Sequence, residues 1–314
     1  MQAIILKEAG GTEQLEFTEM PMPDFQSDEV LIQVKAISIN PVDIKTRSGK
    51  SLYNELKSRN TPIILGWDIS GLITEVGSAV TQYKKGDEVF GMINFPGHGK
   101  AYAEYVAAPA SQLALKPSNI SHETAAAATL AALTAWQALV THAKVTSGQK
   151  ILIHAAAGGV GHYAVQMAKH LGAFVIGTSS ADNKDFVLSL GADEQIDYKT
   201  QQLEDSVKDV DFVLDSIGET TIDSSVAVTK KRGTVIVLPS GISEEKLKNL
   251  NRSGVNCYRI LVESNGDDMK RIAGLLEKGI IVSHISQVFP FEKMREAHLQ
   301  IETGKTKGKI VVAI

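Results

Sequence analysis

A loop of small residues, 154–161, is the part of the sequence whose composition and spacing point most directly to chemistry. It reads His-Ala-Ala-Ala-Gly-Gly-Val-Gly, a G-x-G-x-x-G-type pattern in which Ala156, Gly158 and Gly161 occupy the three glycine positions. Small side chains there let the backbone approach a dinucleotide pyrophosphate, and the N-terminus of a following helix attracts its charge. Glycines also form ordinary turns, but the apolar run 150–153 before the loop and the helical spacing after it favour the cofactor interpretation. The residues expected to bind the cofactor are Ala156, Ala157, Gly158, Gly159, Val160 and Gly161.

The end of the next apolar run, 174–177, bears on which nicotinamide cofactor is bound. An acidic residue at the end of this strand favours NADH, whereas small or basic side chains favour NADPH. Here the strand runs into Ser179 and Ser180, with Lys184 just beyond, and hydroxyls with an ammonium group suit a 2′-phosphate. The rival is Asp182, about 20 residues after the loop, which we interpret as the N-cap of the next helix. The sequence therefore predicts NADPH, held by these two serines and the lysine.

Polar residues at the end of an earlier predicted strand are candidates for the reactive end of the cofactor. Asn40 and Asp43 follow the strand 30–37, and their side chains can orient a nicotinamide ring and its ribose. An Asn-Pro turn is the alternative, because both residues favour turns. Further candidates, at the ends of later strands where parallel sheets bind ligands, are Ile217, Leu238 and Ser240.

Length, composition and charge describe an ordinary globular protein. At 314 residues the chain is long for one core and favours two domains. Hydrophobic residues make up 43% and charged residues 22%, and a net charge of −4 gives no reason to expect nucleic acid or an anionic membrane as a partner. No apolar run approaches the ~18 residues of a membrane span, and the first residues form no secretory signal, so we expect a cytoplasmic location.

The hydrophobic pattern changes twice along the chain. Residues 1–122 contain short strands broken by Gly and Pro, which predicts a small β-barrel or sandwich. A helix capped by Ser121 and running to residue 136 opens the region 123–280, where apolar strands alternate with amphipathic helices as in a parallel, doubly wound sheet. Residues 281–314 are expected to return to the first domain. Strands are predicted at 30–37, 69–76, 88–91, 102–106, 150–153, 174–177, 211–214, 234–238, 258–262 and 308–312.

Motifs along the whole chain share one family pattern. They are Asn40-Pro41-Val42-Asp43, Gly66-Trp67-Asp68-Ile69-Ser70-Gly71, Leu133-Thr134, Gly148-Gln149, the loop 154–161 with Gln166 and Lys169, Asp215-Ser216-Ile217-Gly218, and the closing stretch 304–312. With them the sequence resembles the zinc-independent quinone oxidoreductase and ζ-crystallin branch of the medium-chain dehydrogenase/reductase superfamily. The resemblance implies an α/β fold with a GroES-like catalytic domain (1–122 and 281–314) and a Rossmann NADP-binding domain (123–280). It also implies that Tyr198 lies near the adenosine phosphate, that Thr134 lies near the nicotinamide, and that the protein is a homodimer or homotetramer.

Two positions at which related enzymes bind zinc carry unsuitable residues in this chain. In the zinc alcohol dehydrogenases of the superfamily that it resembles, a Cys begins the segment that here starts at Asn40, and a His stands where this chain has Trp67. Amide and indole groups do not replace thiolate and imidazole in a tetrahedral Zn²⁺ site. The single cysteine, Cys257, cannot build a thiolate site alone. We therefore expect no metal.

Hydride transfer without a Lewis acid restricts the acceptor. The acceptor must already be electrophilic, or hydrogen bonds must polarise it where charge develops. Quinones and α,β-unsaturated carbonyls meet this condition, because conjugation delocalises the incoming charge onto oxygen. The predicted function is NADPH-dependent reduction of a quinone or enone. The alternative is an NADPH-binding protein of low turnover with a crystallin-like or RNA-binding role, although the net charge of −4 weighs against RNA.

Overall fold

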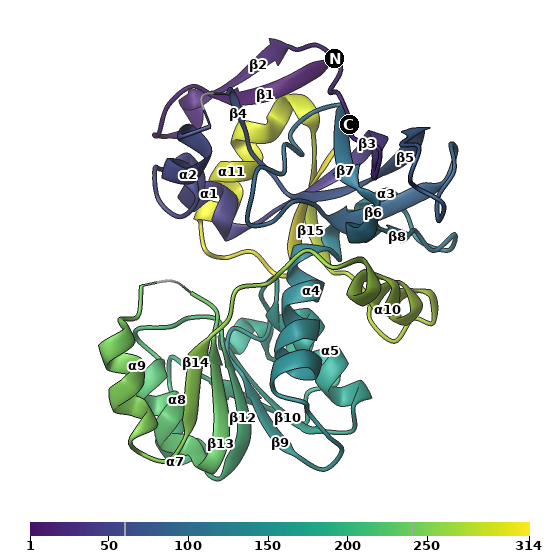
Figure 1. The fold of residues 1–314 in the computed structure, drawn as a ribbon. Helices are drawn as coiled ribbons and strands as arrows, with labels where there is room; N and C mark the ends of the chain where they lie inside the picture. The colour runs from purple at the N-terminus through teal and green to yellow at the C-terminus, as the bar shows by residue number, and fades with distance from the viewer. Residues whose placement is uncertain (60, 240) are drawn as a thin grey trace. The chain divides into compact units, whose positions relative to one another are not determined.

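The chain forms two compact units, shown in Figure 1. The computed structural model describes residues 1–59, 61–239 and 241–314. Unit 1 comprises Met1–Leu133 and Val262–Ile314, and unit 2 comprises Thr134–Leu261. The predicted domain boundaries, after residues 122 and 280, therefore assign two segments to the other unit.

Two helices account for this difference. The Ala-rich α3 (His122–Ala127) packs on β3 and β5 of unit 1, and its last three alanines are buried. Helix α10 (Gly266–Glu277) packs so closely on the same unit that a Cβ added to Gly266 would lie 2.4 Å from the Ser111 carbonyl oxygen. Helical spacing shows that a helix has an apolar face, but not which sheet that face covers.

Unit 1 consists mainly of antiparallel strands in two sheets (Figure 1). One sheet has the order β2-β1-β4, and the other has the order β15-β16-β3-β5-β6-β8, with β7 also paired to β3. The strands are β1 (Gln2–Leu6), β2 (Leu15–Glu19), β3 (Glu29–Ile39), β4 (Ile63–Ile64), β5 (Asp68–Val76), β6 (Glu88–Met92), β7 (Tyr105–Pro109), β8 (Ala114–Leu115), β15 (Ile285–Pro290) and β16 (Lys309–Ala313). The predicted return of the chain to the first domain is confirmed, because β16 pairs antiparallel with β3 and aligns Val311 with Ser38. The remaining helices of this unit are α1 (Pro41–Arg47), α2 (Tyr53–Lys57) and α11 (Met294–Glu302).

Unit 2 is the predicted doubly wound parallel sheet. Its strand order is β11-β10-β9-β12-β13-β14, which is 3-2-1-4-5-6 in the order of the chain. The strands are β9 (Lys150–Ile153), β10 (Phe174–Ser179), β11 (Glu194–Asp197), β12 (Val210–Asp215), β13 (Thr229–Val237) and β14 (Asn256–Arg259), and the helices include α5 (Gly161–His170), α6 (Lys184–Ser189), α7 (Leu203–Ser206), α8 (Ile222–Val228) and α9 (Glu244–Asn251). The order reverses between β9 and β12, and sheets of this kind bind dinucleotides at the carboxyl ends of the strands beside that reversal.

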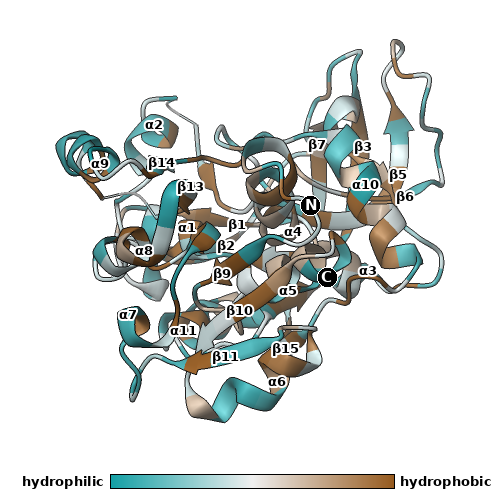
Figure 2. Ribbon diagram, turned by 90° about the horizontal axis from the view of Figure 1, so that it is seen from below, coloured by the Kyte–Doolittle hydropathy of each residue, from teal (hydrophilic) through white to brown (hydrophobic). Residues whose placement is uncertain are grey.

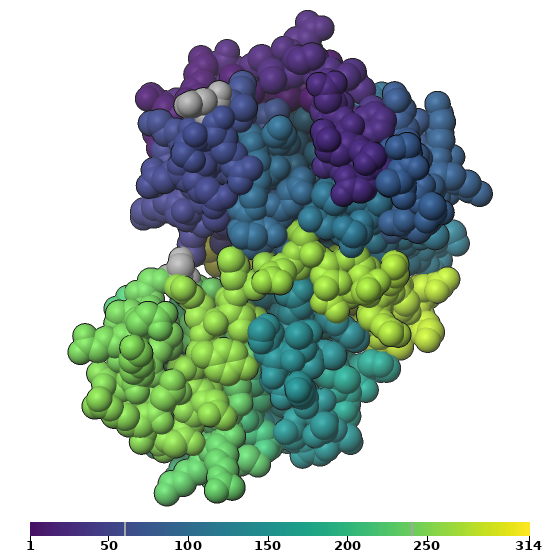
Figure 3. All heavy atoms as spheres, in the orientation of Figure 1, coloured from purple at the N-terminus to yellow at the C-terminus, as the bar shows by residue number. Residues whose placement is uncertain are grey.

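Apolar strands form the core of unit 2. Leu152, Ile176, Val213 and Val235, from four neighbouring strands, are buried in one cluster, and Figure 2 shows the hydrophobic colour along β9 and β10. Polar residues lie on outer helices such as α9, which forms part of the surface visible in Figure 3. In the part of the chain that the structure describes, no helix is both long enough and apolar enough to cross a membrane.

Three predicted elements differ from those observed. The strand predicted at 102–106 is β7, which begins at Tyr105, and the strand predicted at 258–262 is β14, which ends at Arg259. The single helix predicted up to residue 136 is divided into α3 and α4 (Leu130–Trp136). The division has a local cause: the Asp68 carboxylate accepts a hydrogen bond from the Leu130 amide at 3.0 Å, which fixes a new helix start. The Ser121 cap is confirmed, since its hydroxyl accepts a hydrogen bond from the Thr124 amide at 3.2 Å.

Candidate active site

The glycine-rich loop connects β9 to α5 at the point where the strand order of unit 2 reverses. Ala156 stands at the first glycine position, fully buried, and its amide donates a hydrogen bond to the Thr178 carbonyl oxygen at 2.9 Å. Its methyl group fits because the neighbouring strand has Gly177 opposite, where an added Cβ would lie 2.8 Å from the Ala156 Cβ. Alanine is therefore tolerated here through a compensating glycine on β10.

The other two glycines of the motif have different roles. A Cβ added to Gly161 would lie 2.2 Å from the Ala155 carbonyl oxygen, so this residue lets α5 begin directly on the loop. A Cβ added to Gly158 would come no closer than 3.2 Å, to the same oxygen, so the fold tolerates a small side chain there. Residues 158–160 are partly exposed and lie at the N-terminus of α5, the positive end of its dipole, where the His162 amide already donates to the Gly158 carbonyl oxygen at 3.0 Å. This loop therefore fits an anionic group such as a pyrophosphate.

A buried network of polar side chains, the His154 network, joins the strand ends around this loop. It consists of Thr178, His154, Ser225 and Asp215. The His154 Nδ1 lies 3.1 Å from the Thr178 hydroxyl, and Nε2 lies 3.0 Å from the Ser225 hydroxyl, which donates to Asp215 Oδ2 at 2.9 Å. Burial lowers the pKa of His154 and Asp215 raises it, with burial the larger effect, so the ring is held neutral.

Asp215 at the end of β12 also organises the loop that follows it. Its Oδ1 accepts hydrogen bonds from the amides of Ile217 at 2.9 Å and Gly218 at 2.8 Å. The Thr221 hydroxyl donates a further hydrogen bond to the same oxygen at 2.9 Å. The network thus ties the ends of β9, β10 and β12 to one another. The sequence did not predict this role of Asp215, although the Asp-Ser-Ile-Gly motif begins with this residue.

The predicted 2′-phosphate site lies at the ends of β10 and β11. Ser180 is half-buried, Lys184 is exposed as the first residue of α6, and Tyr198 is 63% exposed directly after β11. The Tyr198 amide donates a hydrogen bond to the Ser179 carbonyl oxygen at 3.3 Å, which places it beside the end of β10. Ser179 itself is only 3% exposed, and its hydroxyl donates to the Ser180 carbonyl oxygen and accepts from the Gln195 amide. The structure brings these residues of the predicted 2′-phosphate site together. The Ser179 hydroxyl, however, already forms its hydrogen bonds within the fold.

The interpretation of Asp182 as a helix N-cap is wrong. Asp182 lies inside a short 3₁₀ helix, Ala181–Asn183, and Asn183 holds the N-cap position of α6. The extra turn arises because Ser180 is extended and its carbonyl oxygen accepts a hydrogen bond from the Asn183 amide at 2.9 Å. The Asp182 side chain is exposed.

The candidates at the ends of the later strands lie at the same edge of the sheet. Ile217 follows β12 and is 45% exposed. Leu238 follows β13, half-buried, and its amide donates to the Asp215 carbonyl oxygen at 2.9 Å. Ser240 lies outside the described residues. Thr134 lies on α4 and is 5% exposed.

Asn40 and Asp43 belong to a buried polar cluster in unit 1, the Lys309 cluster, which consists of Asn40, Asp43, Asp68 and Lys309. The side-chain nitrogen of Asn40, Nδ2, donates to Asp68 Oδ2 at 2.7 Å, and its side-chain oxygen, Oδ1, accepts from Lys309 Nζ at 2.5 Å. Lys309 Nζ also donates to the Ile39 carbonyl oxygen at 3.0 Å. Asn40 is extended and forms the N-cap of α1 in a capping box with Asp43, with Pro41 as the first helical residue, so its local conformation is a helix start and not the Asn-Pro turn of the alternative.

The two carboxyl groups of this cluster compete for one buried ammonium group. Asp43 Oδ2 accepts a hydrogen bond from the Asn40 backbone amide at 2.7 Å, whereas Asp43 Oδ1 has no hydrogen-bond partner within the described ranges. Burial raises the pKa of Asp43 to about 7, against the lowering effect of the Asn40 amide. Burial also raises the pKa of Asp68 and lowers that of Lys309. The structure therefore brings the side chains of Asn40 and Asp43 together, but both form their hydrogen bonds within unit 1.

The residues at the two zinc positions do not fit a metal ion. Both donors of the Asn40 side chain amide group face Asp68 and a carbonyl oxygen, and the Trp67 indole donates to the Gly97 carbonyl oxygen at 2.8 Å. Trp67 is fully buried and packs edge-on against Phe95 at a centroid distance of 5.5 Å. Among the described residues, no group of three or more His, Cys, Asp or Glu side chains is arranged to hold a metal.

Comparison with known proteins agrees with this architecture. Residues 26–118 match the model of the alcohol dehydrogenase GroES-like domain, and residues 190–312 match the model described as zinc-binding dehydrogenase. The chain is 36% identical to the 2-methylene-furan-3-one reductase of Solanum lycopersicum, over 94% of this chain and 74% of the relative. It is 35% identical to the NADPH-dependent alkenal/one oxidoreductase, chloroplastic, of Arabidopsis thaliana, over 99% of this chain and 79% of that protein.

A solved structure resembles the whole chain. The quinone oxidoreductase from Coxiella burnetii superposes with a TM-score of 0.95 at 33% identity, covering 100% of this chain and 99% of that one. The identities and coverage are high enough to assign the family rather than the fold alone. The chain belongs to the zinc-independent quinone oxidoreductase branch of the medium-chain dehydrogenase/reductase superfamily.

Proposed function

We propose that the protein is an NADPH-dependent oxidoreductase that transfers a hydride to a quinone or an α,β-unsaturated carbonyl without a metal. The observation that carries the proposal lies at one edge of the unit 2 sheet. There the glycine-rich loop stands where the strand order reverses, and Ser180, Lys184 and Tyr198 follow the neighbouring strands. An acid at the end of β10 would instead have favoured NADH. The named activities of the relatives support the choice of acceptor.

Each group of candidate residues receives one role in this proposal. The loop 156–161 holds the pyrophosphate, and the polar groups after β10 and β11 hold the 2′-phosphate. The nicotinamide is contacted by Thr134 of α4 and by three residues that follow the later strands, namely Ile217, Leu238 and Ser240. Asn40 and Asp43 are positioning residues, because their buried side chains hold the start of α1 in place. NADPH supplies the hydride when bound, and water supplies the proton that completes the reduced product.

Steady-state oxidation of NADPH at 340 nm, with a quinone and with an enone, tests this function. We expect turnover with both acceptors, a clear preference for NADPH over NADH, and full activity after exhaustive chelation. Tight NADPH binding with no turnover for any acceptor would instead support the alternative of a low-turnover binding protein. One equivalent of tightly held zinc, lost together with activity, would contradict the metal-free mechanism.

Gly158→Val separates the cofactor site from the fold. We expect the variant to lose NADPH binding, because a branched side chain would occupy the space that a pyrophosphate needs. The fold should survive, since a Cβ at this position meets only the Ala155 carbonyl oxygen at 3.2 Å. Fluorescence titration with NADPH and thermal unfolding measure the two effects separately. Gly274→Ala is the matched control, because a Cβ there meets nothing within 4 Å.

Two finer expectations belong to the same proposal. We propose a cytoplasmic location, although one relative is named as chloroplastic and another as mitochondrial. We also propose a homodimer or homotetramer, as the family resemblance implies. Sedimentation equilibrium of the purified protein measures the oligomeric state, and a monomer at micromolar concentration would contradict it.

A further inference from the structure

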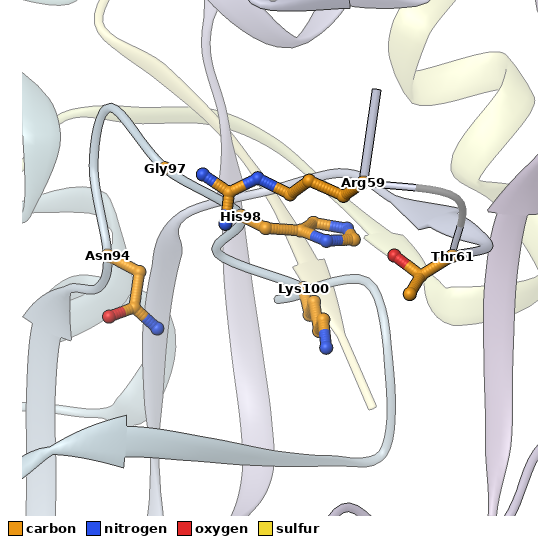
Figure 4. A pocket seen from close by; sticks show the side chains of 6 residues that line it. All are labelled: Arg59, Thr61, Asn94, Gly97, His98 and Lys100. Carbon is orange, nitrogen blue, oxygen red and sulfur yellow. The ribbon is translucent and has the colours of Figure 1, made fainter. Parts of the chain in front are cut away.

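Some residues other than glycine have a positive φ, a conformation that persists only where the surroundings hold the backbone. Two of them, Asn94 with a φ of +53° and Lys100 with a φ of +59°, line the pocket of unit 1 that Figure 4 shows. Another, Ala155 with a φ of +48°, stands in unit 2 between β9 and the glycine-rich loop. Alanine has no side-chain group that can hydrogen-bond to its own backbone. Groups outside Ala155 must therefore hold it in this conformation.

The end of β10 supplies these groups. The Ala155 amide donates to the Thr178 hydroxyl at 3.3 Å, and the next amide, of Ala156, donates to the Thr178 carbonyl oxygen at 2.9 Å. The Ala155 carbonyl oxygen accepts from the Gly158 amide at 2.8 Å, and a Cβ on Gly161 would lie only 2.2 Å from that oxygen. The orientation of the peptide groups at Ala155 thus sets both the turn of the glycine-rich loop and the start of α5.

The hydrogen atoms of the His154 network follow from the acceptors around Ser225. The Ser225 hydroxyl lies 2.9 Å from Asp215 Oδ2 and 2.8 Å from the Thr221 carbonyl oxygen. Both of these oxygens can only accept, so the single hydroxyl hydrogen goes to one of them. His154 Nε2, at 3.0 Å from the same hydroxyl, must then be the donor. Nε2 of His154 therefore carries a proton.

The other ring nitrogen of His154 is an acceptor. Burial lowers the pKa of His154, so the ring is neutral and Nδ1 carries no proton. The Thr178 hydroxyl, 3.1 Å from Nδ1, therefore donates to it. With its one hydrogen used in this way, the Thr178 oxygen accepts from the Ala155 amide. All hydrogen bonds from the Ala155 amide to the Asp215 carboxylate thus point in one direction.

We propose that His154, with its proton on Nε2, is a positioning residue for the cofactor pyrophosphate. Through Thr178 it holds Ala155 in the left-handed conformation, and it thereby holds the glycine-rich loop in the shape that receives the phosphates. The far end of the chain of hydrogen bonds is Asp215, whose Oδ1 accepts from the amides of Ile217 and Gly218. One buried histidine thus connects the glycine-rich loop with the loop after β12. The inference rests on the proposed function for the binding of NADPH, but not for its turnover.

Thr178→Val tests this role, because it removes the hydroxyl and keeps the shape of a buried side chain. We expect the Kd for NADPH to rise by ~10-fold, the size of one lost hydrogen bond, whereas Thr178→Ser keeps the hydroxyl and should retain most of the affinity. Adenosine 2′-phosphate lacks the pyrophosphate, so its affinity, measured by competition, should be the same in wild type and Thr178→Val. An unchanged Kd for NADPH in Thr178→Val, or an equal loss in Thr178→Ser, overturns the proposal.

Thr229→Val is the matched control. It removes the hydroxyl of another buried threonine of unit 2, which donates to a backbone carbonyl oxygen of α8 at 2.6 Å. We expect it to lower the thermal unfolding temperature about as much as Thr178→Val does, but to leave the Kd for NADPH unchanged. If both variants weaken NADPH binding equally, the effect is a general loss of stability and the proposal is wrong.

A second substitution tests the role of Ala155. Glycine adopts a positive φ about as readily as a negative one, so Ala155→Gly in the Thr178→Val background should recover most of the lost affinity for NADPH. In the wild-type background the gain should be much smaller, because the conformation is already held. Equal gains in the two backgrounds, or no gain in the Thr178→Val background, would show that the hydroxyl does not act through Ala155.

Long-range ¹H–¹⁵N correlation spectra of the imidazole rings decide the direction of the hydrogen bonds. We expect the pattern of a neutral ring with its proton on Nε2, assigned to His154 by its loss in His154→Gln. A proton on Nδ1, or a charged ring at neutral pH, contradicts the proposal. If the wild type binds NADPH but reduces no acceptor, the proposed function fails, while the Kd values still decide the role of His154. If the wild type does not bind NADPH, both fail.

Discussion

The His154 network of unit 2 and the Lys309 cluster of unit 1 are both buried and polar, but they differ in charge. In the His154 network a single carboxylate, Asp215, accepts hydrogen bonds from two backbone amides and two hydroxyls. The Lys309 cluster buries two carboxyl groups with one ammonium group and leaves Asp43 Oδ1 without a partner among the described residues. In the His154 network the one carboxylate has hydrogen-bond donors at both oxygens, whereas in the Lys309 cluster one carboxylate oxygen has none among the described residues.

This difference has consequences for stability and for pH dependence. A buried carboxylate that accepts several hydrogen bonds is held rigidly, and burial keeps the neighbouring His154 ring neutral. Buried carboxyl groups that share one cation are costly to desolvate, and one of them takes up a proton more readily than in water. We therefore expect unit 2 to hold its cofactor loops in fixed positions over a wide pH range, and unit 1 to depend on pH.

The largest expected effect comes from removing the cation of the Lys309 cluster. Lys309→Met should lower the free energy of unfolding by about 3–5 kcal/mol, because Asp43 and Asp68 are then buried without the positive charge that stabilises their ionised forms. Urea unfolding followed by circular dichroism measures the loss. The double variant Lys309→Met/Asp68→Asn should regain much of it. A loss no greater than that of the exposed control Lys305→Met would show that the cluster is not stabilising.

The pH dependence of unit 1 follows from Asp43. Its pKa rises from 3.8 in the unfolded chain to about 7 in the fold, so the folded state binds the proton more tightly between these values. The free energy of unfolding should therefore fall as the pH rises from 4 to 7, by about 4 kcal/mol at most. Asp43→Asn should flatten this decline, leaving the contribution of Asp68, whose pKa burial also raises. Parallel curves for wild type and variant, measured by urea unfolding at several pH values, would exclude Asp43 as the source.

A smaller effect is expected in unit 2. Ser225→Ala leaves His154 Nε2 and Asp215 Oδ2 each short of one partner, and should cost ~1–3 kcal/mol of unfolding free energy. The affinity for NADPH should fall with it, because the strand-end loops lose their common anchor. Ser224→Ala is the matched control, since its hydroxyl donates only to a backbone carbonyl oxygen in the same turn. Equal effects of the two substitutions would mean that the His154 network contributes little.

The smallest expected effect lies at the exposed edge of unit 2, outside both networks. Lys184→Ala should weaken NADPH binding by ~1–2 kcal/mol through the loss of a solvent-exposed charge next to the 2′-phosphate. NADH binding should barely change, and stability should be unaffected. Fluorescence titration with both cofactors measures the difference. Equal wild-type affinity for NADPH and NADH would instead favour Asp182 as a ligand of the ribose.

The sequence predicted unit 2 better than unit 1, for physical reasons. The strands of a parallel sheet are buried on both faces, so they appear as apolar runs such as 150–153 and 174–177. Strands β1, β2, β4, β8 and β15 of unit 1 and β11 of unit 2 were not predicted. Strand β15 has three consecutive exposed residues, Ser286–Val288, and shows no apolar run. Its place in the sheet comes from pairing with β16, which propensity does not reveal.

The same distinction applies to the candidate site. The loop 154–161 was predictable, because its function depends on local spacing along the chain. The His154–Ser225 contact spans 71 residues and the Asn40–Lys309 contact spans 269, so neither leaves a local pattern. Asn40 and Asp43 were identified from their residue types. The residues that form hydrogen bonds with their side chains are known only from the folded unit.

The position of Lys309 also sets an order of events during synthesis on the ribosome. Unit 2 is one continuous stretch, Thr134–Leu261, so all its strands exist as soon as that stretch has been translated. The larger segment of unit 1 is made first, but β3 lacks its neighbour β16, and Asn40 lacks the Lys309 ammonium group, until the last residues emerge. Until then the nascent N-terminal segment has an open sheet edge, which favours aggregation. The part of the protein that is translated first is the last to be completed.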